Sequence, residues 1–119
     1  MKEKEIESII KEFKNTVGTI KKEKPEIADA FLGFFRSVHK EGALSIKEKE
    51  LICLGISICA RCKPCIVLHT RSALESGATR PELMETCGAA LMMGGNSLIN
   101  YVSMVLEVFN NSRKLVRSS

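Results

Sequence analysis

The sequence predicts an all-α domain of about six helices that spans residues 1–119. Apolar residues recur every three or four positions over long stretches, which is the period of an amphipathic helix. No stretch alternates apolar and polar residues as a half-buried β-strand does. Two sequences of the form Ser/Thr-x-x-Glu, at 45–48 and 79–82, are typical capping boxes at helix starts. With 45% hydrophobic and only 5% aromatic residues, the core is expected to be aliphatic.

The first helix is expected over residues 3 to about 21, and the second begins at Pro25, because proline is tolerated in a first helical turn. Glu41-Gly42 is expected to end the second helix. Each of these helices has one apolar face. In the first helix that face carries Ile6, Ile9, Ile10, Phe13 and Val17, and in the second it carries Ile27, Ala30, Phe31, Phe34, Phe35 and Val38.

The third helix is expected to begin at the capping box that starts with Ser45 and to run to about Ala60. Its first turn is polar, but residues 51–60 are apolar on nearly every side. A helix that is apolar all round is buried in a core or against another subunit. We therefore expect the third helix to be covered on all sides.

The fourth helix is expected to begin at Cys62 and to end at Glu75 or Ser76, with Gly77 as its C-cap. The second capping box, which includes Pro81, starts a fifth helix that reaches about Met93. Gly94-Gly95 then interrupts the chain. A last helix is expected from about Asn96 to Asn110, followed by a frayed tail over 111–119.

Charge and hydropathy exclude two classes of partner. The net charge is +4, but the lysines near the N-terminus are interleaved with glutamates, and no aromatic-basic stripe accompanies them. This pattern predicts a solvated helix face and no nucleic-acid binding. No apolar segment follows the charged N-terminus, and residues 51–60 are too short to cross a membrane. We therefore predict a cytoplasmic protein without membrane contact, in which five cysteines are not a structural disulfide framework.

The segment Cys62-Lys63-Pro64-Cys65, followed by His69, carries the strongest functional signal. Residues three apart on a helix are neighbours, so the two cysteines can form a disulfide, and His69 returns to the same face. A helix N-terminus, the Lys63 charge and a nearby proton acceptor all favour the reactive thiolate. The spacing predicts a redox-active dithiol. The other three cysteines are expected to be small core residues: Cys53, Cys59 and Cys87.

Two other interpretations of this segment stay open. The pair can be two buried cysteines on a helix. Alternatively, Cys59, Cys62, Cys65 and His69 have the right number and type of ligands for zinc, although structural zinc sites usually draw their ligands from two segments. The chain's other histidine, His39, lies at the predicted end of the second helix, and we assign it no function.

Glu50 completes the pattern Glu-x11-Cys-x2-Cys-x3-His, and with it the sequence resembles the alkylhydroperoxidase D-like branch of the carboxymuconolactone decarboxylase family. The resemblance covers about residues 28 to 108 and includes the order of the helices. It implies an all-helical fold in which Cys62 and Cys65 are the redox cysteines and Glu50 and His69 are their proton-transfer partners. One residue departs from the pattern, because Pro64 stands where the best-studied type has a second histidine.

The resemblance also implies an activity and partners. It implies a thiol-disulfide oxidoreductase with peroxidase-type antioxidant activity that acts on a peroxide or a protein disulfide. An external dithiol, such as a lipoyl-bearing protein, would recharge the site, a peroxiredoxin would be a further partner, and no cofactor would be bound. Assembly into homotrimers or homohexamers is implied as well.

Which cysteine attacks is left open, since the helix terminus favours Cys62 and the nearness of His69 favours Cys65. Two alternatives to the oxidoreductase are a carboxymuconolactone decarboxylase-type enzyme, in which the dithiol would have no role, and a redox-sensing helical module without turnover.

Overall fold

The protein consists of helices, as predicted from the sequence. The computed structural model describes residues 1–118, with side chains as far as residue 112, and this part of the chain contains no β-strand. Six α-helices and one short 3-10 helix follow one another in the order α1 (Glu3–Glu23), α2 (Pro25–Val38), α3 (Ile46–Cys59), α4 (Lys63–Glu75), α5 (Arg80–Gly94), η1 (Asn96–Leu98) and α6 (Ile99–Ser118). The fold class is therefore confirmed. No helix in the described residues is long and apolar enough to cross a membrane.

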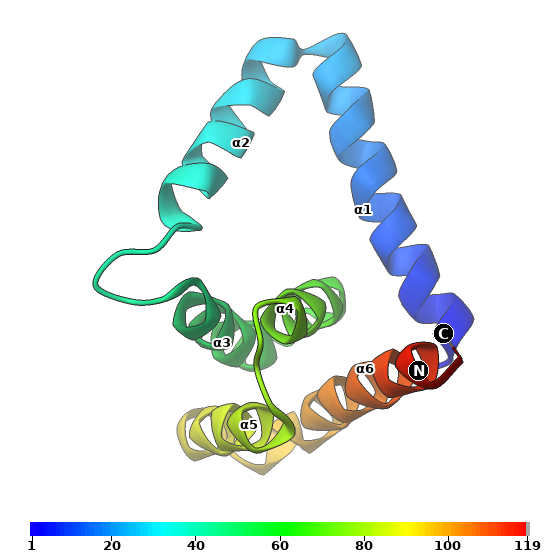
Figure 1. The fold of residues 1–119 in the computed structure, drawn as a ribbon, viewed down its shortest axis with the longest axis vertical. Coiled ribbons are helices and arrows are strands. Elements are labelled where there is room, and N and C mark those ends of the chain that lie inside the picture. Colours follow the sequence, from blue (N-terminus) through cyan, green and yellow to red (C-terminus); the bar gives the residue numbers. More distant parts are fainter. Residues whose placement is uncertain (119) are drawn as a thin grey trace.

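Helices α3 to α6 form a compact body, and α1 and α2 form a helical arm that projects from it (Figure 1). Within the body, α3 packs against α4 and α5, and α4 packs against α6. The arm is attached through α1, which packs against α4 and α2. The radius of gyration is 15.0 Å, whereas a compact domain of this length has about 13.5 Å. The projecting arm accounts for this difference.

Aliphatic side chains fill the core of the body, as the scarcity of aromatic residues predicts. Leu54 and Ile58 of α3 meet Ile66 of α4, and all three are fully buried. A second, smaller cluster attaches the start of α1, where Ile6 packs against Val67 of α4 and Val108 of α6. These clusters hold α3 and α4 side by side, which is the pair of helices that carries the predicted site.

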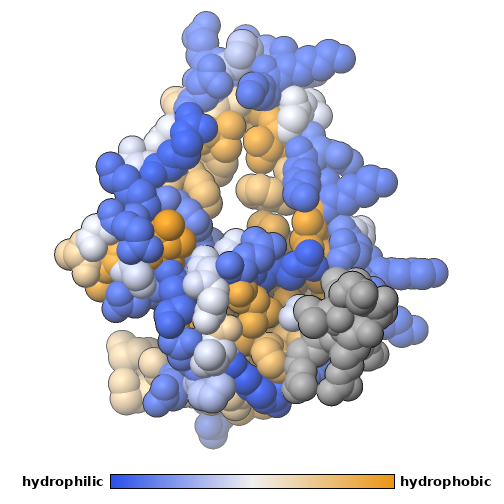
Figure 2. Space-filling model, in the orientation of Figure 1, coloured by the Kyte–Doolittle hydropathy of each residue, from blue (hydrophilic) through white to orange (hydrophobic). Residues whose placement is uncertain are grey.

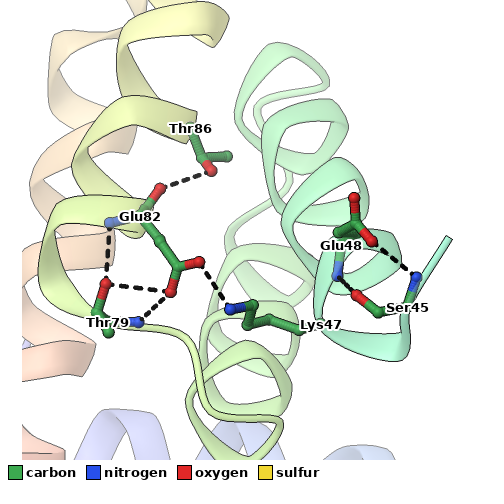
Figure 3. A network of polar contacts seen from close by, with 6 residues as sticks. All are labelled: Ser45, Lys47, Glu48, Thr79, Glu82 and Thr86. Atoms are coloured by element: carbon green, nitrogen blue, oxygen red, sulfur yellow. Dashed lines mark hydrogen bonds and ion pairs between the residues drawn. The ribbon is translucent and has the colours of Figure 1, made fainter.

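Both predicted capping boxes are present, and they join the starts of two helices (Figure 3). At the start of α3, the Ser45 hydroxyl accepts a hydrogen bond from the Glu48 backbone N–H at 3.0 Å, while the Glu48 carboxylate accepts one from the Ser45 N–H at 2.9 Å. Thr79 and Glu82 repeat this exchange at the start of α5. Glu82 also pairs with Lys47 Nζ at 2.8 Å. Local caps and one ion pair therefore set the register between α3 and α5.

The interruption between α5 and α6 falls at the predicted glycines. Gly95 has a φ of +82°, a left-handed conformation that favours glycine. A Cβ on Gly94 would collide with the Leu98 side chain, which turns back into the core. This sharp reversal allows α6 to pack against α4.

Two helix ends differ from the prediction. Helix α2 ends at Val38 and not at Glu41-Gly42, because the Lys49 side chain caps the end of the helix. Its Nζ donates to the Val38 carbonyl at 2.9 Å and to the Lys40 carbonyl at 2.7 Å. Helix α6 continues to Ser118, so the frayed tail predicted over 111–119 is wrong as far as residue 118. Neither glycine nor proline occurs after Asn110 to end the helix. Residue 119 lies outside the described residues.

Several apolar side chains that were expected to be buried are exposed. On α3, Ile52 is 49% and Ile56 is 64% exposed, although the opposite side of the same helix is fully buried. On α2, Phe34 is 71% exposed. Figure 2 shows apolar side chains along the inner faces of the arm, around an opening between the arm and the body. Within the single chain, α4 and α5 cover one face of α3 and leave the face with Ile52 and Ile56 exposed, so burial of that face against another subunit stays a prediction.

Candidate active site

The Glu50 carboxylate is buried at the centre of the candidate site. The Ser45 capping box fixes where α3 starts, and this start places Glu50 in the second turn, where its side chain faces the body and is only 3% exposed. Its Oε2 lies 2.8 Å from Nδ1 of His69, and its Oε1 lies 3.0 Å from Nδ1 of His39. Both oxygens of this buried carboxylate therefore have an imidazole partner.

Cys62 and Cys65 are joined by a disulfide at the start of α4, with their Cα atoms 5.2 Å apart. Cys62 is the N-cap, and its Sγ accepts a hydrogen bond from the backbone N–H of Cys65 at 3.3 Å. Pro64 occupies the first turn, where its missing N–H costs nothing. Arg61, in the link between α3 and α4, adopts a φ of +54°, which is uncommon for a non-glycine residue. The tight reversal at Arg61 presents the dithiol at the positive end of the α4 dipole.

His69 lies one helical turn after Cys65 on α4, and its side chain is 27% exposed. Helical spacing places it on the same face as Cys65, and its Nδ1 is turned to Glu50. When a carboxylate holds Nδ1–H, the other ring nitrogen, Nε2, is left to exchange a proton. The structure thus brings Glu50 and His69, which are nineteen residues apart, into direct contact.

His39 was missed by the sequence analysis. It follows the last residue of α2, and its ring stacks on that of Phe35 with 5.2 Å between ring centroids. The chain contains two histidines, and both contact the same carboxylate. No motif or periodicity links His39 to Glu50, because their contact depends on how the end of α2 meets α3. The sequence signal is indirect: the chain has two histidines and a thiol motif, so each histidine is a candidate for the site.

Lys63 contributes less positive charge to the dithiol than its position suggests. Its ammonium pairs with the Glu5 carboxylate of α1, and this hydrogen bond lowers the pKa of Glu5. The pair attaches the arm to the start of α4. The helix terminus is thus the principal electrostatic feature that favours a thiolate at Cys62.

The remaining cysteines differ from the dithiol. Burial raises the pKa of Cys87 to about 11, and burial, followed by the charge of Glu50, raises the pKa of Cys53. Both are therefore protonated thiols at neutral pH. The prediction that Cys59 is a core residue is wrong: it is exposed at the last residue of α3, where its Sγ lies 3.7 Å from the carbonyl oxygen of Ala90 on α5. Among the described residues, no group of three or more histidine, cysteine or acidic side chains is arranged to hold a metal ion.

Comparison with known proteins shows the family of this chain. Residues 25–107 match the model of the carboxymuconolactone decarboxylase family. The chain belongs to this family. The matched segment includes Glu50, Cys62, Cys65 and His69, and it confirms the family resemblance predicted from the Glu-x11-Cys-x2-Cys-x3-His pattern.

Solved members of the family have the same fold. A carboxymuconolactone decarboxylase family protein from Legionella pneumophila, in its apo form, superposes with a TM-score of 0.85 at 34% identity, over 90% of this chain and 96% of that one. A family protein from Thermotoga maritima, for which a part in the antioxidative response has been suggested, gives 0.71 at 27% identity, over 76% and 94%. An uncharacterized protein of Cupriavidus necator is 28% identical over 106 residues, 89% of this chain and 94% of its own length.

Proposed function

We propose that this member of the carboxymuconolactone decarboxylase family is a thiol-disulfide oxidoreductase with peroxidase-type antioxidant activity. Cys62 and Cys65 are the redox pair, and Glu50 and His69 are their proton-transfer partners. The observation that carries the proposal is the disulfide at the start of α4, one turn before a histidine that is hydrogen-bonded to a buried carboxylate. A buried acid held by an imidazole beside a dithiol is an arrangement that can accept and return thiol protons.

The proposed cycle has three balanced steps. In the first, a thiolate attacks the O–O bond of a hydroperoxide, the O–O bond breaks, and the leaving alkoxide takes a proton to give an alcohol and a cysteine sulfenic acid. In the second, the other cysteine attacks this sulfur, and water leaves as the Cys62–Cys65 disulfide forms. In the third, an external dithiol reduces the disulfide by exchange and is itself oxidised to a disulfide. A protein disulfide can replace the hydroperoxide, in which case a mixed disulfide replaces the sulfenic acid.

Two features of the site favour different cysteines as the attacking residue. The α4 terminus and the hydrogen bond from the Cys65 N–H favour the thiolate at Cys62. The position of His69, one turn beyond Cys65, favours removal of a proton from Cys65. His69 with Glu50 can serve both steps, since it can take a proton from a thiol and return it to the leaving alkoxide in the first step or to the leaving hydroxide, which becomes water, in the second.

The proposal includes the protein's surroundings. The reductant is a dithiol of the lipoyl type, a peroxiredoxin is a further partner, and the protein acts in the cytoplasm without a bound cofactor. The chain assembles into a homotrimer or homohexamer. The exposed apolar side chains of α2 and α3 support assembly, because large exposed apolar patches mark interaction surfaces.

The experiment is a thiol count on the reduced protein before and after one equivalent of tert-butyl hydroperoxide, with mass mapping of the product. Loss of two thiols that map to Cys62 and Cys65, reversed by dihydrolipoamide, supports the cycle. Cys62→Ser and Cys65→Ser each leave one thiol of the redox pair, so the variant in which that thiol is mapped in a mixed disulfide with an added thiol identifies the attacking cysteine. Repeated turnover by both single variants would contradict the scheme. A disulfide that forms but does not turn over with any dithiol would favour a redox sensor.

A further inference from the structure

His39 is held against Glu50 by two successive residues of α3. The Glu50 carboxylate contacts the His39 ring at 3.0 Å, and the neighbouring Lys49 donates to the carbonyls of Val38 and Lys40, the residues on either side of His39. Behind the ring, Phe35 stacks nearly parallel to it, with 18° between the ring planes. Both the backbone and the side chain of His39 are thus fixed in place, which is more than the end of a surface helix needs.

The two imidazoles have a defined relation to the carboxylate between them. An ionised carboxylate only accepts hydrogen bonds, so both His39 and His69 must donate from Nδ1. Each neutral ring then carries its proton on Nδ1 and leaves Nε2 free. If the carboxyl of Glu50 were protonated, its O–H could be donated to one ring, and that ring would have to carry its own proton on Nε2 instead.

Loss of the His39 contact would therefore act on His69. Oε1 of Glu50 would lose its partner in a site that is 3% exposed, and an unpaired buried carboxylate oxygen favours the protonated form. The Glu50 O–H would then be donated to Nδ1 of His69, which would move the His69 proton to Nε2 and remove the basic nitrogen. The titratable groups that face Glu50 in the described structure are His39 from the end of α2, His69 from α4 and Cys53 from α3 itself.

We propose that His39 is a positioning residue of the dithiol site, which keeps Glu50 as a carboxylate and thereby keeps His69 in the tautomer that can exchange a proton with a thiol. This inference rests on the proposed oxidoreductase function. His39 acts through Glu50 and has no assigned contact with sulfur. Because His39 ends α2, the helical arm becomes part of the site, and the Cys-x-x-Cys-x-x-x-His motif does not describe the site completely.

Two substitutions separate the hydrogen bond from the ring. His39→Phe keeps an aromatic ring for the stack on Phe35 but removes the Nδ1–H donor. His39→Asn keeps an N–H donor close to the place of Nδ1 and cannot titrate. The rate of Cys62–Cys65 disulfide formation with tert-butyl hydroperoxide is measured across mildly acidic to alkaline pH, after thermal unfolding shows that each variant is folded. We expect His39→Phe to be about tenfold slower than the wild type, and His39→Asn to remain within about threefold of it.

Nitrogen NMR of the histidine rings provides a readout that does not depend on turnover, and in the wild-type protein it does not depend on a variant that folds. At mildly alkaline pH the wild-type rings of His39 and His69 are expected as Nδ1–H tautomers, and His39→Phe is expected to move His69 toward Nε2–H. A wild-type His69 that carries its proton on Nε2 would overturn the inference, and so would an unchanged rate in His39→Phe. Equal loss in His39→Phe and His39→Asn would assign His39 a proton-carrying role and overturn positioning. If the wild type forms no disulfide at all, the proposed function fails, while the NMR result still decides the role of His39.

Discussion

Substitution of Glu50 by glutamine tests whether the buried carboxylate serves the dithiol. Glu50→Gln keeps the shape of the side chain but replaces two acceptor oxygens by one acceptor and one donor. In the wild-type protein, His39 and His69 both donate to the ionised Glu50 carboxylate, at 3.0 and 2.8 Å. In the variant only one of them can donate, and the other must change its tautomer to accept.

The magnitude follows from the two hydrogen bonds. A hydrogen bond to a charged group contributes about 1.5–3 kcal/mol and a neutral one about 0.5–1.5 kcal/mol, so exchanging two of them removes about 2–3 kcal/mol. Relief from burying a charge offsets part of this loss, so we expect the free energy of unfolding to fall by less than about 2 kcal/mol. The effect on rate is expected to be larger, because general acid–base assistance contributes about 10²–10⁴-fold.

The assay mixes reduced protein with tert-butyl hydroperoxide, quenches with an alkylating reagent, and follows the Cys62–Cys65 disulfide by mass spectrometry; urea unfolding gives the stability. Glu48→Gln is the matched control: it makes the same change two residues earlier, on an exposed side chain that caps α3. Glutamine also suits this capping position, so the control is expected to keep the wild-type rate. A folded Glu50→Gln protein with a rate within about threefold of the wild type would refute the role of Glu50.

Four other predictions concern metal binding, packing, acid stability and assembly. Cys59→Ser is expected to leave the disulfide-formation rate unchanged, and elemental analysis is expected to find no zinc in the purified protein. Cys59 contacts the Ala90 carbonyl, and among the described residues no metal-binding group includes it. Leu54→Ala, at a fully buried position, is expected to lower the free energy of unfolding by about 2–5 kcal/mol in urea titration. Hydrogen bonds from Lys47 and Thr79 hold the pKa of Glu82 below its ordinary value of 4.5. The stabilisation from the ionised Glu82 is fully present above pH 4.5 and is lost as the pH falls through the folded-state pKa. The melting temperature is therefore expected to drop in that pH range, and to drop less steeply in Glu82→Gln. Ile56→Glu is expected to shift the sedimentation of a trimer or hexamer toward the monomer, and an unchanged sedimentation coefficient would place the interface elsewhere.

The helices could be predicted because their signals are local. The two capping boxes, the prolines at the starts of α2 and α5, and the Gly94-Gly95 break each act within one or two turns of chain, so the sequence predicts them directly. The ends that were predicted wrongly depend on distant or missing signals. Helix α2 ends early because the Lys49 side chain, eleven residues beyond Val38, caps it. Helix α6 extends to Ser118 because nothing in the sequence stops it.

The residues of the candidate site likewise fall into those predicted by local spacing and those that depend on tertiary contacts. Cys62, Cys65 and His69 belong to one helix, so their spacing alone determines that they are neighbours. Glu50 needed the family pattern, because its contact with His69 joins two helices. His39 belongs to no pattern: only the way the chain folds between the end of α2 and α3 brings it to Glu50. The burial of Cys59 also depended on tertiary structure: its apolar neighbours predict burial, but it lies exposed at the end of α3, beside the Ala90 carbonyl of α5. The sequence by itself thus determined the helices and the dithiol, whereas the tertiary structure decided which carboxylate and which imidazoles surround it, since long-range contacts leave no periodic trace in the chain.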